Sequence, residues 1–261
     1  MRLSPLSTHD ALRLNSDRVQ LLRETLAEET AVALLFNGVP YVVMMATPAD
    51  LEDFACGFAL SEGIVERVDE VQVVDVLSRE NGIAVHLAIP GARFEALETR
   101  RRNLVGRSGC GLCGAETLSD AIRPVRSVPP GTSLTAAALR DAFARLAQSQ
   151  PLNRECGALR AAAALCGETL LVREDVGRHN ALDKAIGALA RTDHRAQALL
   201  VTSRASYELV HKTAQAGVSI LAAVSAPTAY AVRLAEEAGL TLIGFARDTR
   251  LTVYAHALRV V

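Results

Sequence analysis

Regular alternation of predicted strands and helices in the second half of the chain is the feature that most restricts its fold. Apolar stretches with strand character are separated there by amphipathic stretches of helical length. The predicted strands are Leu170–Arg173, Ala198–Val201, Val218–Val224, Leu240–Phe245 and Leu251–Ala255, and the predicted helices are Ala181–Arg191, Ser206–Ala216 and Thr228–Ala238. This alternation is typical of an α/β layer fold, in which helices cover a mainly parallel sheet. We therefore predict an α/β lobe in this half.

The first part of the chain predicts a smaller lobe made of β-hairpins and one helix. Strand-like runs flank Asn37-Gly38 and Asn81-Gly82, dipeptides that favour two-residue hairpin turns. Between the two hairpins, Thr47 is expected to cap a helix that has Pro48 in its first turn and ends at Gly63. The sequence thus predicts an α+β protein overall, with α/β character in the larger lobe.

The predicted boundary between the lobes lies at a glycine-rich, proline-rich seam. The smaller α+β lobe is expected to span residues 1–106 and the larger α/β lobe residues 107–261, which opens with a loop over residues 107–131. In the larger lobe, the alanine run Ala161–Ala164 is expected to be helical.

Composition limits the partners and the compartment. The formal net charge of −1 gives no overall support for binding nucleic acid or a membrane. The N-terminal residues lack a signal-peptide core, and the longest apolar runs are too short to span a bilayer. Five cysteines, an odd number without a regular framework, favour free thiols in a reducing compartment. We expect a cytoplasmic protein without nucleic-acid or membrane partners.

A glycine-flanked cysteine pair lies near the middle of the chain. Gly106–Gly114 contains Cys110 and Cys113 in a Cys-x-x-Cys arrangement, with glycine before, between and after the two thiols. Four arginines precede Cys110 at positions 100, 101, 102 and 107, and their positive field favours thiolate over thiol. The sequence therefore predicts reactive rather than buried sulfur in this segment.

Other roles are compatible with parts of this cysteine pattern. A structural zinc site within one chain needs a second pair, which Cys56, Cys156 and Cys166 do not supply, although a site shared across a dimer stays open. A dithiol–disulfide oxidoreductase fits the spacing but not the surrounding glycines. A zinc deaminase is excluded, because no histidine has glutamate two residues later. We expect no resident metal.

Polar loops follow successive predicted strands of the larger lobe. They are Arg173–Asn180 with Asp183 and Lys184, Thr202–Ser206, Ser225–Thr228 and Phe245–Arg250. In open α/β sheets, ligands bind beyond the carboxyl ends of the strands, where helix N-termini attract anions. Helix capping could account for Ser203, Ser206 and Ser225, and a charged hairpin for the last loop. Together, the loops predict a pocket for a phosphate-bearing, nucleotide-like ligand.

With these motifs in place, the chain resembles the FdhD family of formate dehydrogenase accessory sulfurtransferases. The resemblance covers roughly residues 28–254. Its most specific strings are Cys-Gly-Leu-Cys-Gly at 110–114 and Arg-Glu-Asp-Val-Gly-Arg-His-Asn-Ala-Leu-Asp-Lys at 173–184. Shorter matches are Phe36–Gly38, Val42–Ala46, Gly57–Gly63, Arg204–Glu208, Ser225–Thr228 and Leu240–Phe245.

The resemblance implies a role in sulfur relay. A cysteine desulfurase would hand a persulfide sulfur to Cys110, with Cys113 assisting, for transfer to the bis-molybdopterin guanine dinucleotide form of the molybdenum cofactor before its insertion into formate dehydrogenase. It also implies a homodimer whose larger, three-layer lobe is similar to cytidine deaminase, without zinc chemistry. A GDP-like guanine nucleotide is expected to fit the same site.

Cofactor-binding residues are also assigned by resemblance and by the loop pattern. The segment at the position of the family's cofactor-binding residues comprises Phe245, Ala246, Arg247, Asp248, Thr249 and Arg250. Arg204 and Ser206 are expected to hold phosphate. Asp175, Arg178, His179 and Lys184 are expected to shape the pocket. Catalytic roles are assigned only to Cys110 and Cys113.

Two segments depart from the family pattern. Cys156–Arg160 stands where the family usually has Thr-Gly-Gly-x-His, and Thr202–Arg204 replaces Ser-Gly-Arg. The missing histidine and glycines predict an altered pocket floor, with either reduced or redirected activity.

Overall fold

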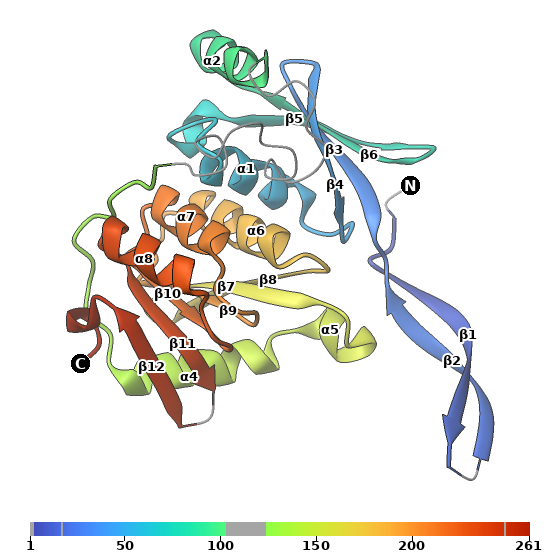
Figure 1. The fold of residues 1–261 in the computed structure, drawn as a ribbon. Helices are drawn as coiled ribbons and strands as arrows, with labels where there is room; N and C mark the ends of the chain where they lie inside the picture. The colour runs from blue at the N-terminus through green and yellow to red at the C-terminus, as the bar shows by residue number, and fades with distance from the viewer. Residues whose placement is uncertain (1–2, 17, 103–123, 248) are drawn as a thin grey trace.

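The computed structural model describes residues 3–16, 18–102, 124–247 and 249–261. Within these ranges the chain forms a six-stranded sheet, a four-stranded sheet and a separate two-stranded hairpin (Figure 1). The mixed α/β architecture confirms the predicted fold class.

The six-stranded sheet forms the centre of the larger lobe. Its order is β12-β11-β10-β9-β7-β8. The strands are β7 (Arg160–Cys166), β8 (Thr169–Asp175), β9 (Ala198–Val201), β10 (Ile220–Ala223), β11 (Thr241–Arg247) and β12 (Arg250–Ala255). Strands β9, β10 and β11 are parallel, and β7 is antiparallel to both β8 and β9. Strands β8, β9, β10 and β11 therefore all point toward one edge.

Helices cover both faces of this sheet, so the lobe has three layers (Figure 1). One face carries α6 (Arg178–Ala190), α7 (Tyr207–Gln215) and α8 (Ala229–Ala238), and the other carries α4 (Ala136–Gln148); the short α5 (Pro151–Cys156) leads into β7. Buried residues of α6, α7 and α8 form one apolar cluster with the sheet, and those of α4 form another. Two cores thus fix the positions of the helix N-termini.

The alanine run Ala161–Ala164 lies inside β7, so its prediction as helix was wrong. Ala162 and Ala164 join the cluster under α6, while Ala161 and Ala163 join the cluster under α4. Small side chains on both faces let both helix layers approach the strand. Tertiary packing therefore outweighs the helix propensity of alanine.

The smaller lobe has a four-stranded sheet with one helix packed on it. The order is β4-β3-β6-β5, formed by β3 (Thr30–Phe36), β4 (Val39–Ala46), β5 (Gln72–Arg79) and β6 (Gly82–Ala88). Helix α1 (Leu51–Ser61) packs on one face, a 3₁₀ turn (Val68–Glu70) precedes β5, and α2 (Gly91–Arg102) follows β6. The predicted turn at Asn37-Gly38 connects β3 to β4. The second hairpin turns at Glu80-Asn81, one residue before the predicted Asn81-Gly82, because Gly82 pairs with Arg79 in the ladder.

The two lobes meet where α1 crosses α6. A Cβ atom added to Gly57 would lie 1.7 Å from the backbone oxygen of Asp183, and one added to Gly187 would lie 1.9 Å from that of Asp53. The two helix backbones approach closely because these two positions lack side chains. The predicted boundary between residues 106 and 107 lies outside the described residues.

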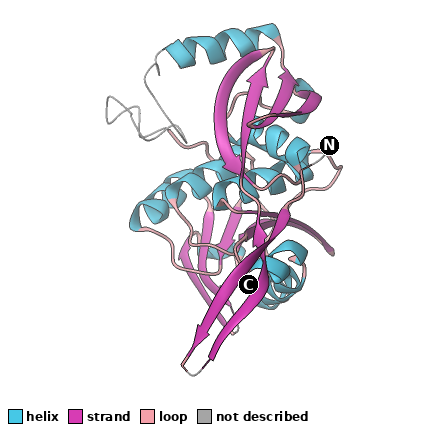
Figure 2. Cartoon of the chain, turned by 90° about the vertical axis from the view of Figure 1, so that its right-hand side faces the viewer, coloured by secondary structure: helices cyan, strands magenta, loops and turns pink. Residues whose placement is uncertain are grey.

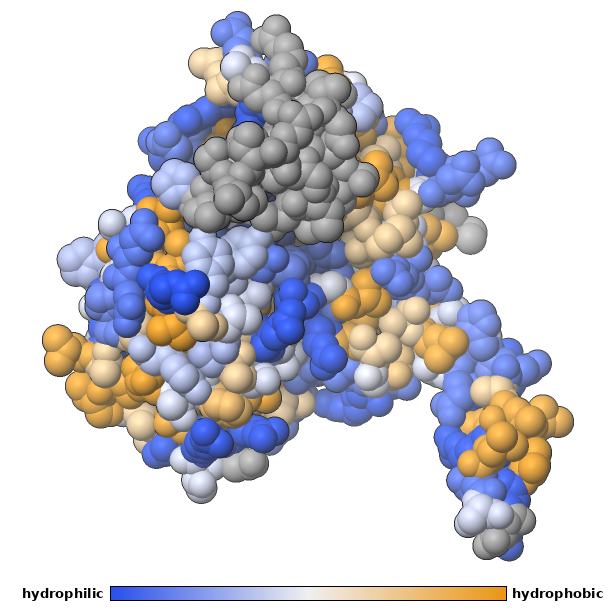
Figure 3. All heavy atoms as spheres, in the orientation of Figure 1, coloured by the Kyte–Doolittle hydropathy of each residue, from blue (hydrophilic) through white to orange (hydrophobic). Residues whose placement is uncertain are grey.

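A hairpin that the sequence analysis did not predict projects from the body (Figures 1 and 2). It consists of β1 (Leu6–Asn15) and β2 (Arg18–Ala27), paired antiparallel. Near its tip, Leu12 pairs with Leu21 and Leu14 with Val19, and these four side chains are 56–80% exposed. Figure 3 shows an apolar patch near the end of the projecting hairpin, the part of the chain to which these four residues belong.

No described helix is long and apolar enough to cross a membrane. The chain closes with a second 3₁₀ turn (Ala257–Arg259), after which Val260 forms a bridge with Leu134 ahead of α4.

Candidate functional site

Three loops at the carboxyl edge of the larger sheet contact one another directly. Thr228 N donates to Ala205 O at 3.0 Å, and Phe245 N donates to Ser225 O at 3.2 Å. Ala205 also forms a bridge with Pro227. The loops after β9, β10 and β11 are therefore contiguous, as the parallel-strand pattern predicted. The end of β8 lies at the same edge, because Ala161 and Ala162 of β7 connect it to β9.

The loop after β11 begins with a distorted backbone. Phe245 has a φ of +52°, and the pairing of β11 with β12 is irregular between Gly244 and Arg247. The Arg250 guanidinium lies 4.0 Å from the centre of the Phe245 ring, in a cation–π contact. This arrangement presents an aromatic ring and a cation side by side, as recognition of a phosphorylated base requires.

Other members of the predicted binding segment differ in exposure. Arg247 and Thr249 are exposed beside Arg250, whereas Ala246 is 1% exposed and packs in the apolar cluster with α4. The side chain of Ala246 therefore contributes to the core, which leaves its backbone at the edge. Asp248 lies outside the described residues.

Asp175 and Lys184 form a fully buried ion pair between the lobes. Lys184 Nζ lies 2.7 Å from Asp175 Oδ2, and both side chains are completely buried. Asp175 Oδ1 accepts hydrogen bonds from Gly177 N at 2.8 Å and from Asn180 Nδ2 at 3.0 Å. These polar groups are engaged within the protein, so a direct role of the pair in ligand binding stays a prediction.

Thr47 completes this link instead of capping α1, so the predicted helix cap was wrong. Its N–H donates to Asp175 Oδ2 at 3.0 Å, its carbonyl accepts from Lys184 Nζ at 3.0 Å, and its hydroxyl accepts from Val176 N at 3.1 Å. Helix α1 begins four residues later, after Asp50. The Thr47 contacts therefore fix the loop after β8 to the smaller lobe.

Arg178, His179 and Ser206 lie on the first turns and N-cap of neighbouring helices. Gly177 precedes α6, and Ser206 is the N-cap of α7. His179 Nε2 lies 3.7 Å from Glu208 Oε2. Burial alone would raise the pKa of Glu208. The His179 imidazole, the Ser206 side chain and the backbone N–H of Glu208 itself outweigh burial and lower this pKa to about 2. Glu208 is therefore ionised beside His179.

The serines at this edge do not all serve as caps. Ser206 makes no side-chain capping bond, and the expected cap Ser225 does not start α8. Thr228 is the N-cap there, and its hydroxyl accepts from Ala231 N at 3.2 Å.

Several arginines at this edge carry unneutralised charge. Arg160, Arg178, Arg204, Arg247 and Arg250 form no ion pair with any carboxylate in the part of the chain that the structure describes. By contrast, Arg173 and Arg191 both pair with Asp53, away from the edge. Free guanidinium groups beside three helix N-termini favour anion binding.

Sequence reasoning missed a buried charge cluster beneath His179. Lys212 Nζ lies 2.9 Å from Asp183 Oδ1, Glu62 Oε1 and Ser61 Oγ, and Ser61 donates to Asp183 at 2.6 Å. Burial raises the pKa of Asp183. Burial would lower the pKa of Lys212, but its carboxylate partners outweigh burial and raise it. Helical spacing is the sequence pattern that could have indicated this cluster. It places Asp183 one turn after His179 on α6, and Lys212 one turn after Glu208 on α7.

A sequence model of the FdhD/NarQ family matches residues 27–261, nearly the whole chain. The chain belongs to the FdhD/NarQ family. A Cupriavidus necator protein named "Sulfur carrier protein FdhD" is 52% identical over 257 residues, which cover 97% of this chain and 89% of that protein. A protein of the same name from Xanthomonas euvesicatoria is 50% identical over 251 residues, covering 95% and 89% respectively.

A solved structure shares the fold of this FdhD/NarQ chain. The crystal structure of a protein from Desulfotalea psychrophila, described as a formate dehydrogenase accessory protein, matches with a TM-score of 0.74 and 22% identity. The match covers 98% of this chain and 99% of that one. The shared arrangement includes both lobes.

The predicted catalytic residues of this FdhD/NarQ chain, Cys110 and Cys113, lie outside the described residues. Of the other cysteines, Cys56 and Cys166 are buried, and burial raises the pKa of both thiols. Cys156 is partly exposed. The described residues contain no group of three or more histidine, cysteine, aspartate or glutamate side chains that could hold a metal ion.

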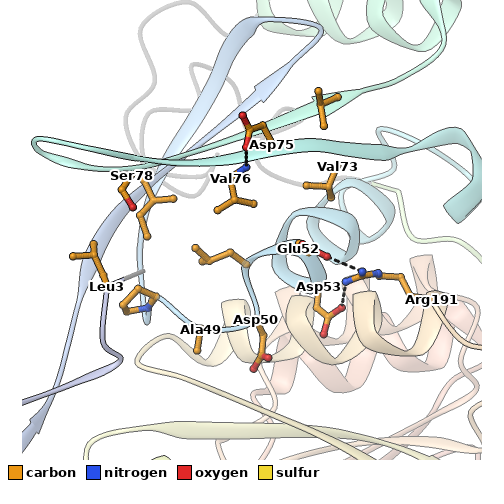
Figure 4. A pocket seen from close by; sticks show the side chains of 14 residues that line it. Leu3, Ala49, Asp50, Glu52, Asp53, Val73, Asp75, Val76, Ser78 and Arg191 are labelled. Atoms are coloured by element: carbon orange, nitrogen blue, oxygen red, sulfur yellow. Dashed lines mark hydrogen bonds and ion pairs between the residues drawn. The ribbon is translucent and has the colours of Figure 1, made fainter. Parts of the chain in front are cut away.

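A separate cavity of about 550 Å³ lies between β5, the start of α1 and Arg191 at the end of α6 (Figure 4). Its wall includes Val73 and Val76, and Arg191 pairs there with Glu52 and Asp53. None of the residues predicted for ligand binding lines this cavity. We therefore assign the candidate site to the carboxyl edge.

Proposed function

We propose that this chain is a sulfur carrier that accepts persulfide sulfur on Cys110 from a cysteine desulfurase. It would pass the sulfur to bis-molybdopterin guanine dinucleotide before that cofactor enters formate dehydrogenase. The two relatives named as sulfur carrier proteins support sulfur carriage. The observation that carries the ligand assignment is the Phe245–Arg250 contact among unpaired arginines at the carboxyl edge.

The loading step needs only one exchange of bonds. The Cys110 thiolate attacks the terminal sulfur of the desulfurase persulfide, a new S–S bond forms, and the donor cysteine leaves as thiolate. The electrons balance without an added oxidant or reductant. Arginines at 100, 101, 102 and 107 favour the attacking thiolate. In this scheme Cys113 assists delivery: its thiolate attacks Cys110 Sγ, the Cys110–Cys113 disulfide forms, and the outer sulfur leaves at the sulfide level, so the dithiol supplies the two electrons.

The substrate end of the proposal rests on charge and stacking. A guanylated pterin offers phosphates to Arg204, Arg247 and Arg250, and a base to Phe245. The Asp175–Lys184 pair holds the loop after β8 in place and so acts as a positioning element. The proposal also expects a homodimer in the cytoplasm.

The loading claim is tested by incubating the protein with a cysteine desulfurase and cysteine and measuring its intact mass. We expect a gain of one sulfur atom in the wild type, none in Cys110→Ala, and an unchanged gain in Cys156→Ser. The last variant removes the partly exposed thiol among those the structure describes. A gain that survives in Cys110→Ala contradicts the assignment.

The same experiment separates the two alternatives that the cysteine pair allows. A dithiol–disulfide oxidoreductase would exchange disulfides through Cys110 and Cys113 without ever carrying sulfane sulfur. A zinc-bridged dimer would contain stoichiometric zinc that is lost in Cys110→Ala. Measuring zinc content and disulfide exchange on the same samples assigns each outcome.

A further inference from the structure

Three buried polar atoms without hydrogen-bond partners belong to the first turn of α6 and the N-cap of α7. Among the residues that the structure describes, Arg178 Nε, His179 Nε2 and Ser206 Oγ are the buried side-chain nitrogen and oxygen atoms that lack a partner. Buried polar groups are normally satisfied, because an unmade bond is unfavourable. Three such atoms on two adjacent helix starts therefore indicate a site for a bound group.

Ser206 provides the clearest case. Its side chain is 4% exposed, and it occupies the N-cap position of α7 without making a capping bond. The N-cap threonines of α4 and α8 both accept a bond from the first turn of their helices. Ser206 lies near enough to Glu208 to lower the pKa of that carboxyl, yet its Oγ makes no hydrogen bond of normal geometry, so the hydroxyl can donate to a bound acceptor.

Neighbouring contacts hold the two helix starts at a fixed separation. His179 of α6 faces Glu208 of α7 across 3.7 Å, which is an ion-pair distance but too long for a hydrogen bond. One turn further along, Lys212 of α7 binds both carboxylate oxygens of Asp183 of α6. The site is therefore built on rigid elements, which run side by side in Figure 1.

We propose that Arg178, His179 and Ser206 form a subsite for a single phosphoryl group, separate from the Phe245–Arg250 hairpin. All three side chains can donate hydrogen bonds, and two helix N-termini add positive potential, so a tetrahedral oxyanion fits the set. Arg178 and His179 are only partly buried, which leaves a path from solvent.

The position of this subsite has a consequence for the ligand. Strands β9 and β11 are two strand spacings apart in the sheet, which is about 10 Å at the usual spacing. A ligand that fills both places must carry a phosphoryl group about that far from the group stacked on Phe245. This inference rests on the proposed function only for the identity of that ligand.

The test uses inorganic phosphate as the probe and the full-length protein at constant ionic strength. Isothermal titration calorimetry gives the affinity, and thermal unfolding gives the stability. Ser206→Ala should weaken phosphate binding about tenfold to a hundredfold, the expected effect of removing a hydrogen bond to a charged group. Its melting temperature should change little, because Ser206 does not cap α7.

Thr135→Ala is the matched control, since Thr135 caps α4, which lies on the other face of the sheet. This variant should melt at a lower temperature but bind phosphate as tightly as the wild type. A wild type without saturable binding, a Ser206→Ala variant of unchanged affinity, or equal losses in both variants would overturn the subsite. Persulfide loading is measured separately, so failure of the carrier function and failure of this subsite are distinguishable.

Discussion

Lys212 Nζ lies 2.9 Å and 3.0 Å from the two carboxylate oxygens of Asp183, with both side chains almost completely buried. The contact joins α6 to α7 directly beneath His179 and Glu208. Glu62 extends it to α2, because Arg100 donates to the Glu62 carbonyl at 3.0 Å. A charged core therefore fixes the elements that form the proposed phosphoryl subsite.

Breaking this ion pair should be more damaging than replacing it. Lys212→Met leaves Asp183 buried without its cation, and we expect a loss of about 3–5 kcal/mol in the free energy of unfolding. The double variant Lys212→Met/Asp183→Leu removes both charges and should recover part of that loss. Urea unfolding of the wild type, both single variants and the double variant gives the coupling energy. Strictly additive losses would contradict an interacting pair.

Glu208 should make stability depend on acid pH. Its pKa is lowered from 4.5 to about 2 in the folded protein. Because the folded value lies below the unfolded one, this contribution is present above about pH 4.5 and is lost as the pH falls toward 2. Allowing for partial exposure, we expect about 1–2 kcal/mol.

Unfolding in urea at several pH values tests this contribution. The stability advantage of the wild type over Glu208→Gln should shrink between pH 6 and about pH 2.5. Glu237→Gln changes an exposed glutamate of α8 and serves as the control. A wild-type advantage that does not vary with pH would count against the lowered pKa of Glu208.

The helix crossing between the lobes should not tolerate a methyl group. Gly57→Ala places a Cβ against the Asp183 carbonyl, and Gly187→Ala does the same against Asp53. We expect each to lower the free energy of unfolding by about 3 kcal/mol or more, because backbone atoms would have to move. In Gly91→Ala the new Cβ meets no atom within 4 Å, so this control should stay near wild-type stability.

Guanine nucleotide binding should depend on the cation–π contact. Arg250→Ala removes the guanidinium over Phe245 and a candidate phosphate ligand, so GDP affinity should fall by about threefold to thirtyfold. Arg140→Ala changes an exposed arginine of α4, on the opposite face of the sheet, and should bind GDP normally. Equal affinities for the wild type and Arg250→Ala would remove the hairpin from the binding site.

Short sequence patterns predicted a hairpin turn and the order of strands and helices in the larger lobe. The Asn37-Gly38 turn was found because its backbone conformation is specific, with a positive φ at both residues. The second turn was predicted one residue too late. Loops 202–206, 225–228 and 245–250 were expected to lie together because parallel strands end at one edge. The polar residues of the candidate site could be named for the same reason. Their individual roles could not be, because sequence does not show which polar atoms already have partners.

Predictions failed where distant contacts decide the structure. Ala161–Ala164 is a strand because helices pack on both of its faces. Thr47 forms a hydrogen bond with Asp175 although 128 positions separate the two residues. Lys212 gave no sign of burial, because a lysine in a helix usually faces solvent. The hairpin Leu6–Ala27 was missed because its exposed leucines do not follow the pattern of a buried face.

The central claim is that a sulfur atom is held on Cys110 and then leaves for the molybdenum cofactor. The most direct measurement loads the protein with radiolabelled sulfur from cysteine, removes the desulfurase, and adds the guanylated molybdenum cofactor without reductant. We predict that label leaves the protein and appears in the cofactor fraction, and that Cys110→Ala transfers none. Label that stays on the wild-type chain, or that is released only as sulfide after reduction, would contradict the account.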